Sequence, residues 1–418
     1  MNPYWLYLHP YVHSAIKKER AVIYNTLNGK ILEYKENKKI VRLINRLNSD
    51  SNLYVIKLKE EEIDASLSQF IKDIRKFYMG DLIDTIHSPN KPIQLKPMLN
   101  LQKTFDYLTT YGNKSKILIN DELGEYLNVV TLYINDRCDL SCPMCSTAYK
   151  QFLCCFKTDI GRKEIAINHI SQLINEIKNI NLYKFNILGG NIFLYSKLFE
   201  LIPLLNSINV IKEFYVHYLH LDDGREYSEL FSDENNHLSI FIHFPLKMEE
   251  FNQRMSLLNH YDIGKRIHFL IEKDEDMAKA ERVISDYQIE DYILTPYYNG
   301  NNLKFFKENV FLNRDSIIES KPTMNDIFAR MTINTSDFKK LTILSNGDVY
   351  ANLNNPKIGK LGKDYLFDLM YKELNEGKSW TKVRKHVSPC KGCVYNALCP
   401  PISNYEYIIG RYNLCDML

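Results

Sequence analysis

Apolar runs alternate with helical patterns through the middle of the chain. Six apolar runs of strand length lie between residues 126 and 310, and most are separated by helical spacing near 164–179, 196–208, 248–260 and 276–287. Alternating strands and helices are typical of parallel βαβ units. The pattern therefore predicts an α/β domain over residues 126–310. Six units fit an open, partial (β/α)6 barrel better than a closed barrel of eight strands.

The first 95 residues follow a different pattern. Residues 20–34 form two apolar segments around Asn28-Gly29, which is a strong signal for a β-hairpin. Residues 37–48 and 61–79 carry apolar side chains at helical spacing. We therefore predict a small winged-helix-like module over residues 1–95.

The last hundred residues change pattern again, after a predicted linker or bridging segment over 96–125. A hairpin signal surrounds Asn346-Gly347, a helical pattern covers 364–376, and the tail from Ser388 is dense in Cys, Pro, Gly and Asn. A tail with so few core residues usually needs a covalent or metal staple. We predict a small Cys-rich domain over residues 311–418.

Charge and hydropathy exclude several classes of partner. Lys and Arg number 53 against 51 Asp and Glu, so the net charge of +2 indicates neither a nucleic-acid binder nor a polybasic membrane binder. No apolar run approaches the ~18 residues of a spanning helix, and the N-terminal sequence lacks the pattern of a signal peptide. We expect a cytoplasmic protein with no nucleic-acid partner and no membrane partner.

The nine cysteines fall into two groups, five between Cys138 and Cys155 and four between Cys390 and Cys415. In a reducing cytoplasm such clustering indicates metal or redox chemistry before disulfides. The first group contains a C-x3-C-x2-C motif directly after a predicted strand, at the sheet edge where active sites form. Three thiolates can hold three irons of a [4Fe–4S] cluster and leave the fourth iron open to a small molecule. The motif cysteines are Cys138, Cys142 and Cys145.

This motif, its place after the first strand and the six βα units resemble the radical SAM superfamily. The resemblance implies that the three cysteines bind a [4Fe–4S] cluster whose open iron binds S-adenosylmethionine (SAM). The reduced cluster then cleaves SAM to a 5′-deoxyadenosyl radical, which abstracts hydrogen from the substrate. An electron donor such as flavodoxin or ferredoxin is implied, and no catalytic residue beyond the cluster is assigned.

Two further features bear on SAM binding. Met144 stands where the family usually carries an aromatic residue near the adenine. Gly189-Gly190-Asn191 ends the second strand and resembles the family's Gly-Gly-Glu-like motif, whose backbone contacts the SAM amino group; Gly189, Gly190 and Asn191 are therefore candidate SAM contacts. Asn191 keeps an oxygen acceptor but lacks the charge of the usual Glu.

Other interpretations of the first group stay open at this point. A structural zinc knuckle could use the same thiolates, although a C-x3-C opening is atypical of zinc. Cys154 and Cys155 could be small core residues or reactive thiols near the cluster.

The second group resembles the SPASM extension of radical SAM peptide-modifying enzymes, which usually holds two auxiliary clusters. Asn352 and Ser403 stand where that pattern has cysteines, and the positions of one whole site are lost. The resemblance implies one complete auxiliary [4Fe–4S] cluster with a redox or structural role, while four thiolates could also hold zinc. The four candidate ligands are Cys390, Cys393, Cys399 and Cys415.

The N-terminal module resembles the PqqD-like element that binds the leader of a ribosomally made peptide by strand addition; a generic helical cap is the alternative. The tail also resembles those of peptide maturases from Bacteroides-type gene systems. The sequence thus predicts a radical SAM/SPASM-type enzyme that modifies a ribosomally synthesised precursor peptide with a leader. Two rivals remain, an anaerobic sulfatase-type maturase and a catalytically degenerate peptide-binding partner.

Overall fold

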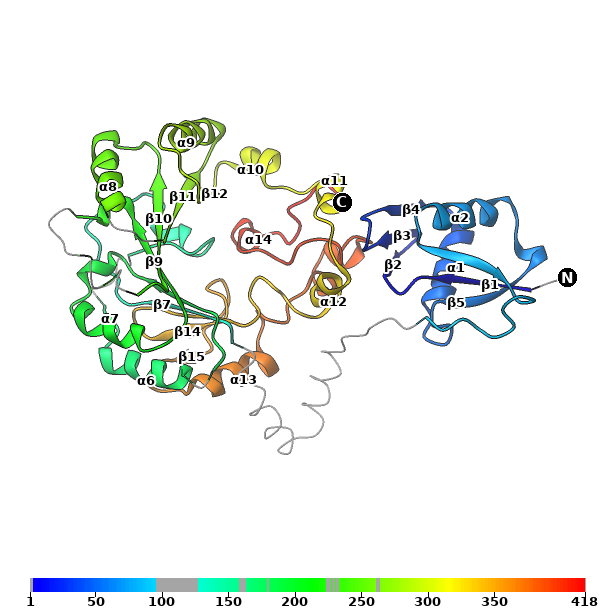
Figure 1. Cartoon of the computed structure of the whole chain (residues 1–418), viewed down its shortest axis with the longest axis horizontal. Coiled ribbons are helices and arrows are strands. Elements are labelled where there is room, and N and C mark those ends of the chain that lie inside the picture. The colour runs from blue at the N-terminus through cyan, green and yellow to red at the C-terminus, as the bar shows by residue number, and fades with distance from the viewer. Residues whose placement is uncertain are drawn as a thin grey trace.

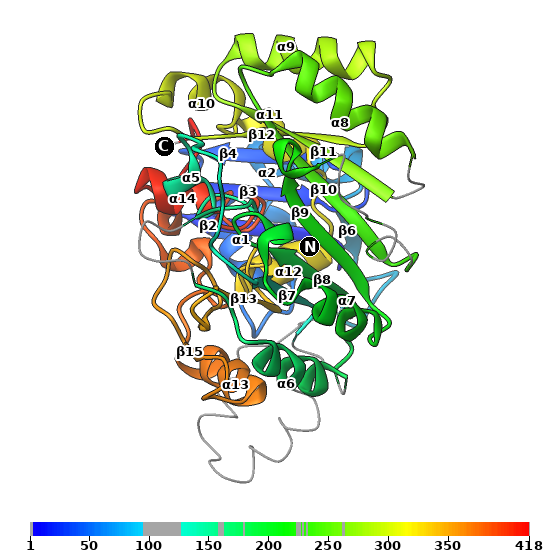
Figure 2. The same cartoon turned by 90° about the vertical axis from the view of Figure 1, so that its left-hand side faces the viewer.

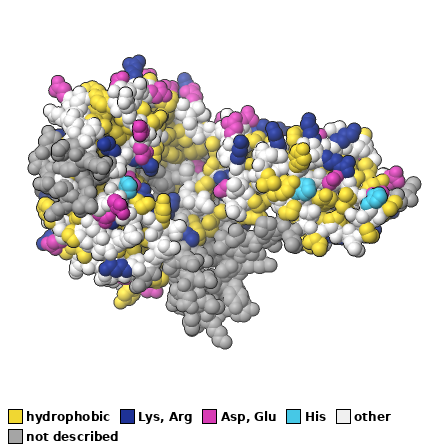
Figure 3. All heavy atoms as spheres, viewed as in Figure 1, with side chains coloured by type: hydrophobic (Ala, Val, Ile, Leu, Met, Phe, Trp, Pro, Cys, Tyr) yellow, Lys and Arg dark blue, Asp and Glu magenta, His cyan; other side chains and the backbone are white. Residues whose placement is uncertain are grey.

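The computed structural model describes residues 3–94, 127–157, 163–178, 180–222, 227, 230, 233–260 and 264–417. The predicted linker over 96–125 lies outside the described residues. A small N-terminal unit and a large α/β unit lie at opposite ends of an elongated molecule, and C-terminal segments lie between them (Figure 1). Basic and acidic side chains are both scattered over the face in Figure 3, in keeping with the near-zero net charge.

A nine-stranded sheet organises the α/β unit. Six parallel strands follow one another in chain order, as predicted: β7 (Val129–Tyr133), β8 (Lys184–Leu188), β9 (Ile211–His217), β10 (Asn236–His243), β11 (Gly264–Ile271) and β12 (Tyr292–Pro296). The sheet does not stop at β7, because β13 (Lys340–Ile343) pairs parallel with it. The antiparallel strands β14 (Asp348–Tyr350) and β15 (Gly359–Lys360) complete the order. The sheet stays open and twisted (Figure 2).

Helices cover the outer face of this sheet, at the four intervals where helical spacing predicts them. They are α6 (Ile167–Ile177), α7 (Leu198–Asn206), α8 (Met248–His260) and α9 (Asp274–Asp286) (Figures 1 and 2). Successive residues of a strand point to opposite faces, and β7 shows the result. Its Val130 and Leu132 join the helix-facing core, whereas Tyr133 joins a second cluster on the inner face. The inner face leads to the loops that carry the first cysteine motif.

Two three-stranded antiparallel sheets and two helices build the N-terminal unit. One sheet has the order β5 (Val55–Lys59), β1 (Pro3–Leu8), β6 (Gly80–Asp84), and the other β2 (Val12–Lys17), β3 (Arg20–Asn25), β4 (Ile31–Lys35). The predicted hairpin is confirmed, since β3 and β4 pair across a turn in which Gly29 has a φ of 72°. The helices are α1 (Lys38–Asn48) and α2 (Ala65–Lys76). The winged-helix-like interpretation of this unit stays a prediction.

Short helices and loops make up most of the remaining C-terminal chain. The predicted hairpin at Asn346-Gly347 is confirmed by the antiparallel pair β13–β14, with a φ of 83° at Gly347. This hairpin extends the sheet of the preceding domain across the predicted boundary at residue 310. The helices of this segment are α10 (Leu303–Asn309), α11 (Arg314–Glu319), α12 (Met324–Thr332), α13 (Leu366–Glu376) and α14 (Asn404–Ile409).

The N-terminal unit contacts the cysteine-rich tail through strand β3. Its Ala21 and Ile23 belong to the core of the N-terminal unit, whereas Val22 and Tyr24 lie in a separate apolar cluster with Cys393 and neighbouring tail residues. Strand β3 is therefore buried on both faces. Figure 1 shows β2, β3 and β4 beside the C-terminal segments.

Candidate functional site

The three motif cysteines meet in one cavity at the C-terminal end of the parallel strands. Cys138 and Cys142 lie in the loop after β7, and Cys145 begins the short helix α5 (Cys145–Ala148). All three thiols are free and partly exposed. Besides these cysteines, the lining residues are Leu140, Met144, Cys154, Cys155, Phe156, Gly190, His217, His220, Phe241 and Leu270.

Asn135 ties the cysteine loop to the glycine motif that follows β8. Its side-chain oxygen accepts hydrogen bonds from the backbone N–H groups of Arg137 (3.1 Å) and Gly190 (3.2 Å), and its Nδ2 donates to the Asn191 carbonyl at 3.0 Å. A Cβ on Gly190 would lie 2.2 Å from the Arg137 carbonyl oxygen. Glycine is therefore required here because backbone packs against backbone beside Cys138.

Only one of the three residues of the glycine motif, Gly189-Gly190-Asn191, lines the cavity. Gly190 lines the cavity, and Gly189 packs against Asn135. Asn191 is buried, and its side-chain oxygen accepts from the Phe193 N–H at 3.1 Å, which caps the turn η3 (Ile192–Leu194). An Asn at this position thus has a local structural use, and its contact with SAM stays a prediction.

The motif sulfurs have the surroundings that a cluster needs. The backbone N–H of Leu140 donates to Cys138 Sγ at 3.4 Å, and that of Lys157 donates to Cys145 Sγ at 3.3 Å. Burial and then the neighbouring thiols raise the pKa of Cys142 to about 11. Three crowded thiolates are therefore unfavourable alone, and bound cationic iron would relieve their repulsion. N–H donors to sulfur are a usual feature of cluster sites, so the donor set fits a [4Fe–4S] cluster.

Met144 and the adjacent cysteines Cys154 and Cys155 also line this cavity. Met144 is buried in the inner-face cluster, together with Tyr133 and Cys154. Burial raises the pKa values of Cys154 and Cys155 well above that of an ordinary thiol. Both residues are therefore neutral thiols in the metal-free protein, which favours the small-core-residue interpretation of Cys154.

Sequence reasoning missed three histidines at this site. His217 ends β9, His220 ends the following turn η4 (Tyr218–His220), and His243 ends β10. Each histidine ends or follows an apolar strand run, but its place at the edge where Cys138 lies follows only once the neighbouring strands are known to pair in parallel. Burial lowers the pKa of His217 to about 2 and that of His220 to about 4, so both rings are neutral near pH 7.

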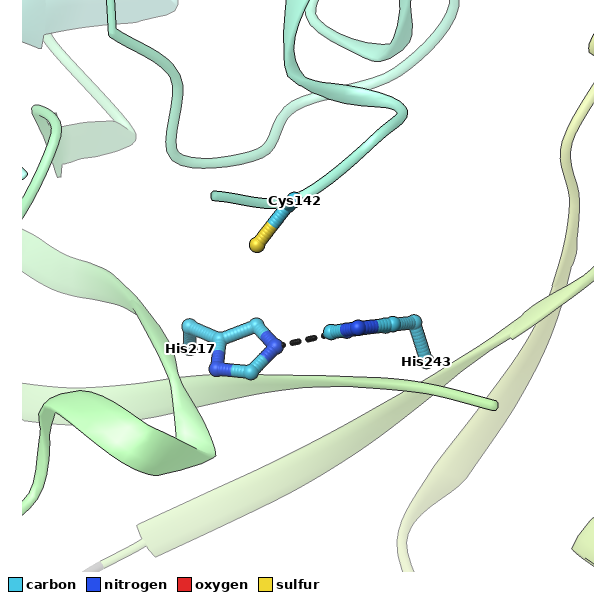
Figure 4. A group of neighbouring side chains, drawn as sticks. All are labelled: Cys142, His217 and His243. Atoms are coloured by element: carbon cyan, nitrogen blue, oxygen red, sulfur yellow. Dashed lines mark hydrogen bonds between the residues drawn. The ribbon is translucent and has the colours of Figure 1, made fainter. Parts of the chain in front are cut away.

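Two of these histidines form a pair beside Cys142 (Figure 4). The sulfur of Cys142 and ring nitrogens of His217 and His243 lie within 4.8 Å of one another, a spacing that could hold a metal ion. However, His217 Nε2 and His243 Nδ1 are hydrogen-bonded at 2.8 Å, and His217 Nδ1 accepts from the Leu219 N–H at 3.2 Å. A metal ion on this set would have to break the imidazole pair, which favours the three-cysteine site.

The four cysteines of the second group also line one cavity, as their spacing predicts. Cys390 begins the turn η6 (Cys390–Gly392), and Cys415 is brought back to the site by a bridge with Leu312. Arg384, which lines the same cavity, forms a buried ion pair with Glu406 at 2.8 Å. Burial raises the pKa of Cys399 to about 12. The four cavity-lining thiols are those of Cys390, Cys393, Cys399 and Cys415.

Asn352 and Ser403, which stand where the resembled SPASM pattern has cysteines, both make hydrogen bonds in this structure. Asn352 is buried and donates to Asp337 Oδ1 at 2.8 Å and to Asn404 Oδ1 at 2.7 Å. Ser403 caps α14, and its backbone N–H donates to Glu406 Oε2 at 2.7 Å. Asn352 thus links the segment around Asp337 to helix α14.

No helix in the described part of the chain has both the length and the apolar character needed to cross a membrane.

No family model matches the chain, and no curated protein matches it in sequence. Among solved structures, Streptococcus suis SuiB bound to precursor peptide SuiA is 14% identical with a TM-score of 0.50, and the match covers 98% of both chains. A second SuiB structure is 13% identical with a TM-score of 0.50, covering 98% of this chain and 97% of that one. SuiB bound to S-adenosylmethionine is 14% identical with a TM-score of 0.48, covering 98% of this chain and 97% of that one. The chain therefore has the fold of SuiB along nearly its whole length, which confirms, for the fold, its resemblance to radical SAM peptide maturases.

Proposed function

We propose that this protein is a radical SAM enzyme that modifies a ribosomally synthesised precursor peptide. One observation carries the proposal: Cys138, Cys142 and Cys145 meet in a cavity at the C-terminal end of the parallel strands, with Gly190 on its wall. Active sites of parallel sheets form at that end. The fold shared with SuiB, a protein solved with its precursor peptide SuiA, supports a peptide as the substrate.

The residues around the cavity have defined tasks in this proposal. The three cysteines would hold three irons of a [4Fe–4S] cluster, and Gly190 would let backbone approach SAM at the fourth iron. When bound and reduced by a donor such as flavodoxin or ferredoxin, the cluster supplies cleavage of SAM to a 5′-deoxyadenosyl radical. The buried Met144 and Phe241 would exclude water from the reacting atoms.

Product analysis tests this proposal. The anaerobically reconstituted and reduced protein should release 5′-deoxyadenosine from SAM, and Cys142→Ala should abolish that release. Cys154→Ala is the matched control, because this thiol lies in the same cavity but outside the motif. Failure of the wild-type protein to form 5′-deoxyadenosine, even with a peptide encoded beside its gene, would favour the peptide-binding partner.

We also propose that Cys390, Cys393, Cys399 and Cys415 hold one auxiliary [4Fe–4S] cluster, because all four thiols line one cavity. Full ligation by cysteine leaves no iron open, which favours a redox or structural role. Metal analysis should find about eight irons per chain, and about four in Cys393→Ala. About four irons with one zinc in the wild-type protein would assign the second site to zinc instead.

Leader recognition is proposed for the N-terminal unit. Strands β2 and β4 each leave an outer edge in their three-stranded sheet, and an extended peptide can add to such an edge through its main chain. The contact of β3 with the cysteine-rich tail would hold the leader near the second site. A chain lacking residues 1–88 should lose affinity for a leader-bearing peptide, as measured by fluorescence anisotropy. Undiminished affinity would contradict this role.

A further inference from the structure

We propose that His220 is a positioning residue for the SAM-cleaving cluster, donating a hydrogen bond to the sulfur of Cys138 that raises the cluster's reduction potential. The inference rests on the proposed function, since it assumes a cluster on the first cysteine motif. The observation that supports it is the distance of 3.3 Å between His220 Nε2 and Cys138 Sγ.

The backbone of its own turn fixes the His220 ring. The turn η4 follows β9 directly, and the N–H of His217 donates to His220 Nδ1 at 3.3 Å. The side chain of His217 also bonds to this turn, because its Nδ1 accepts from the Leu219 N–H. The two histidines therefore cap the turn η4 reciprocally. His220 is 5% exposed, so its ring has little freedom to turn away from Cys138.

These bonds also place the proton of the ring. Nδ1 of His220 accepts a backbone N–H and therefore carries no proton itself. The proton of the ring is then on Nε2, the nitrogen that faces Cys138 Sγ. His220 is thus an N–H donor to a sulfur that would be a cluster ligand.

The direction of the effect follows from charge. Reduction adds an electron that is shared among the irons and their sulfur ligands, so an N–H aimed at a ligand sulfur stabilises the reduced form more than the oxidised form. Hydrogen bonds to the sulfurs are among the factors that set the potential of such clusters. His220 therefore makes the cluster easier to reduce, which is the step required before SAM cleavage.

A redox titration followed by electron paramagnetic resonance tests the inference on the reconstituted full-length protein. His220→Phe removes the donor and should shift the midpoint potential of the first cluster to a more negative value, whereas His220→Gln keeps an N–H donor and should recover part of the shift. His268→Phe is the matched control. His268 is a half-buried histidine of the same barrel, whose Nε2 contacts Ser239 at 3.2 Å and which does not line the cavity. A Cys142→Ala preparation supplies the signal of the second site for subtraction.

The outcomes separate this inference from the function on which it rests. A wild-type protein with no cluster on the first motif would overturn the proposed function itself. An intact cluster whose potential is the same in His220→Phe and in the wild type would overturn the role of His220 alone. If His220→Phe takes up no iron, pulsed resonance on wild-type protein containing [15N]histidine decides the question. A hyperfine coupling to one imidazole nitrogen that disappears in His220→Gln is then expected, and absence of that coupling from the wild type refutes the hydrogen bond.

Discussion

The ion pair between Arg384 and Glu406 gives a stability prediction for the second cysteine site. The Arg384 side chain is 9% exposed and that of Glu406 is 1% exposed. The guanidinium donates to both carboxylate oxygens, at 2.8 and 3.2 Å, and also to the carbonyls of Pro401 (3.1 Å) and Tyr412 (3.0 Å). Replacing Arg384 by Met would leave the Glu406 charge buried without its partner.

The expected cost is large for one substitution. Breaking a buried ion pair by removing one partner costs about 3–5 kcal/mol, because the remaining charge stays out of water. With a urea dependence of about 1–3 kcal/mol per molar, this corresponds to a midpoint lower by roughly 1–5 M. The double variant Arg384→Met/Glu406→Gln removes both charges and keeps an amide oxygen for the cap of α14. It should therefore be clearly more stable than the single variant.

Fluorescence of Trp380 measures this loss. The chain has two tryptophans, and Trp380 is fully buried four residues before Arg384, with its indole N–H bonded to the Lys340 carbonyl at 3.1 Å. A Trp5→Phe background leaves Trp380 as the single reporter for urea unfolding. The reasoning is refuted if Arg384→Met costs less than about 1 kcal/mol, or if the double variant is no more stable than the single one.

Three further predictions concern other parts of the chain. Burial raises the pKa of Asp337 to about 7 from its ordinary 3.8, so stability should fall as pH rises from about 4 to 7, and urea unfolding of Asp337→Asn should show a flatter pH profile. Gly190→Ala should lose iron at the first site, as read by metal analysis, because the new Cβ would meet the Arg137 carbonyl at 2.2 Å. Tyr24→Ala should weaken the contact between the N-terminal unit and the tail by about 3–5 kcal/mol, whereas Arg314→Ala, which removes the half-exposed pair with Glu33, should cost under about 1 kcal/mol. Limited proteolysis between the two units should cleave Tyr24→Ala faster than Arg314→Ala, and equal cleavage rates would contradict the prediction.

Periodicity predicted the sheet because its strands are buried and its helices amphipathic. The helical spacing near 164–179 corresponds to α6, whose Ile170, Leu173, Ile174 and Ile177 are all buried. The pairing of β13 with β7 was not predictable in the same way. A short apolar run with a hairpin signal specifies its neighbour β14, but nothing local specifies a strand two hundred residues earlier.

The spacing of the cysteines predicted that each group acts together, and in the structure each group lines one cavity, while cluster binding stays a proposal. The histidines were not identified, because a single His after a strand becomes informative only when the register of neighbouring strands is known. Parallel pairing of β9 with β10 aligns His217 with Phe241, and the pairing places His243 at the same edge. That alignment is tertiary information. Without it, His220 is only one residue near an apolar run, and its contact with Cys138 is not apparent.

A polar network around Asn352 joins separate parts of the chain by hydrogen bonds. Asn352 joins Asp337 to Asn404, and Asn354 donates to the Lys150 carbonyl at 2.8 Å. Lys150 lies five residues after Cys145, so this network reaches the chain that leaves the first motif. Buried polar networks are stabilising only when their members are satisfied together, and the Asn352 amide meets that condition, because its Nδ2 donates twice and its Oδ1 accepts from the Asn354 N–H.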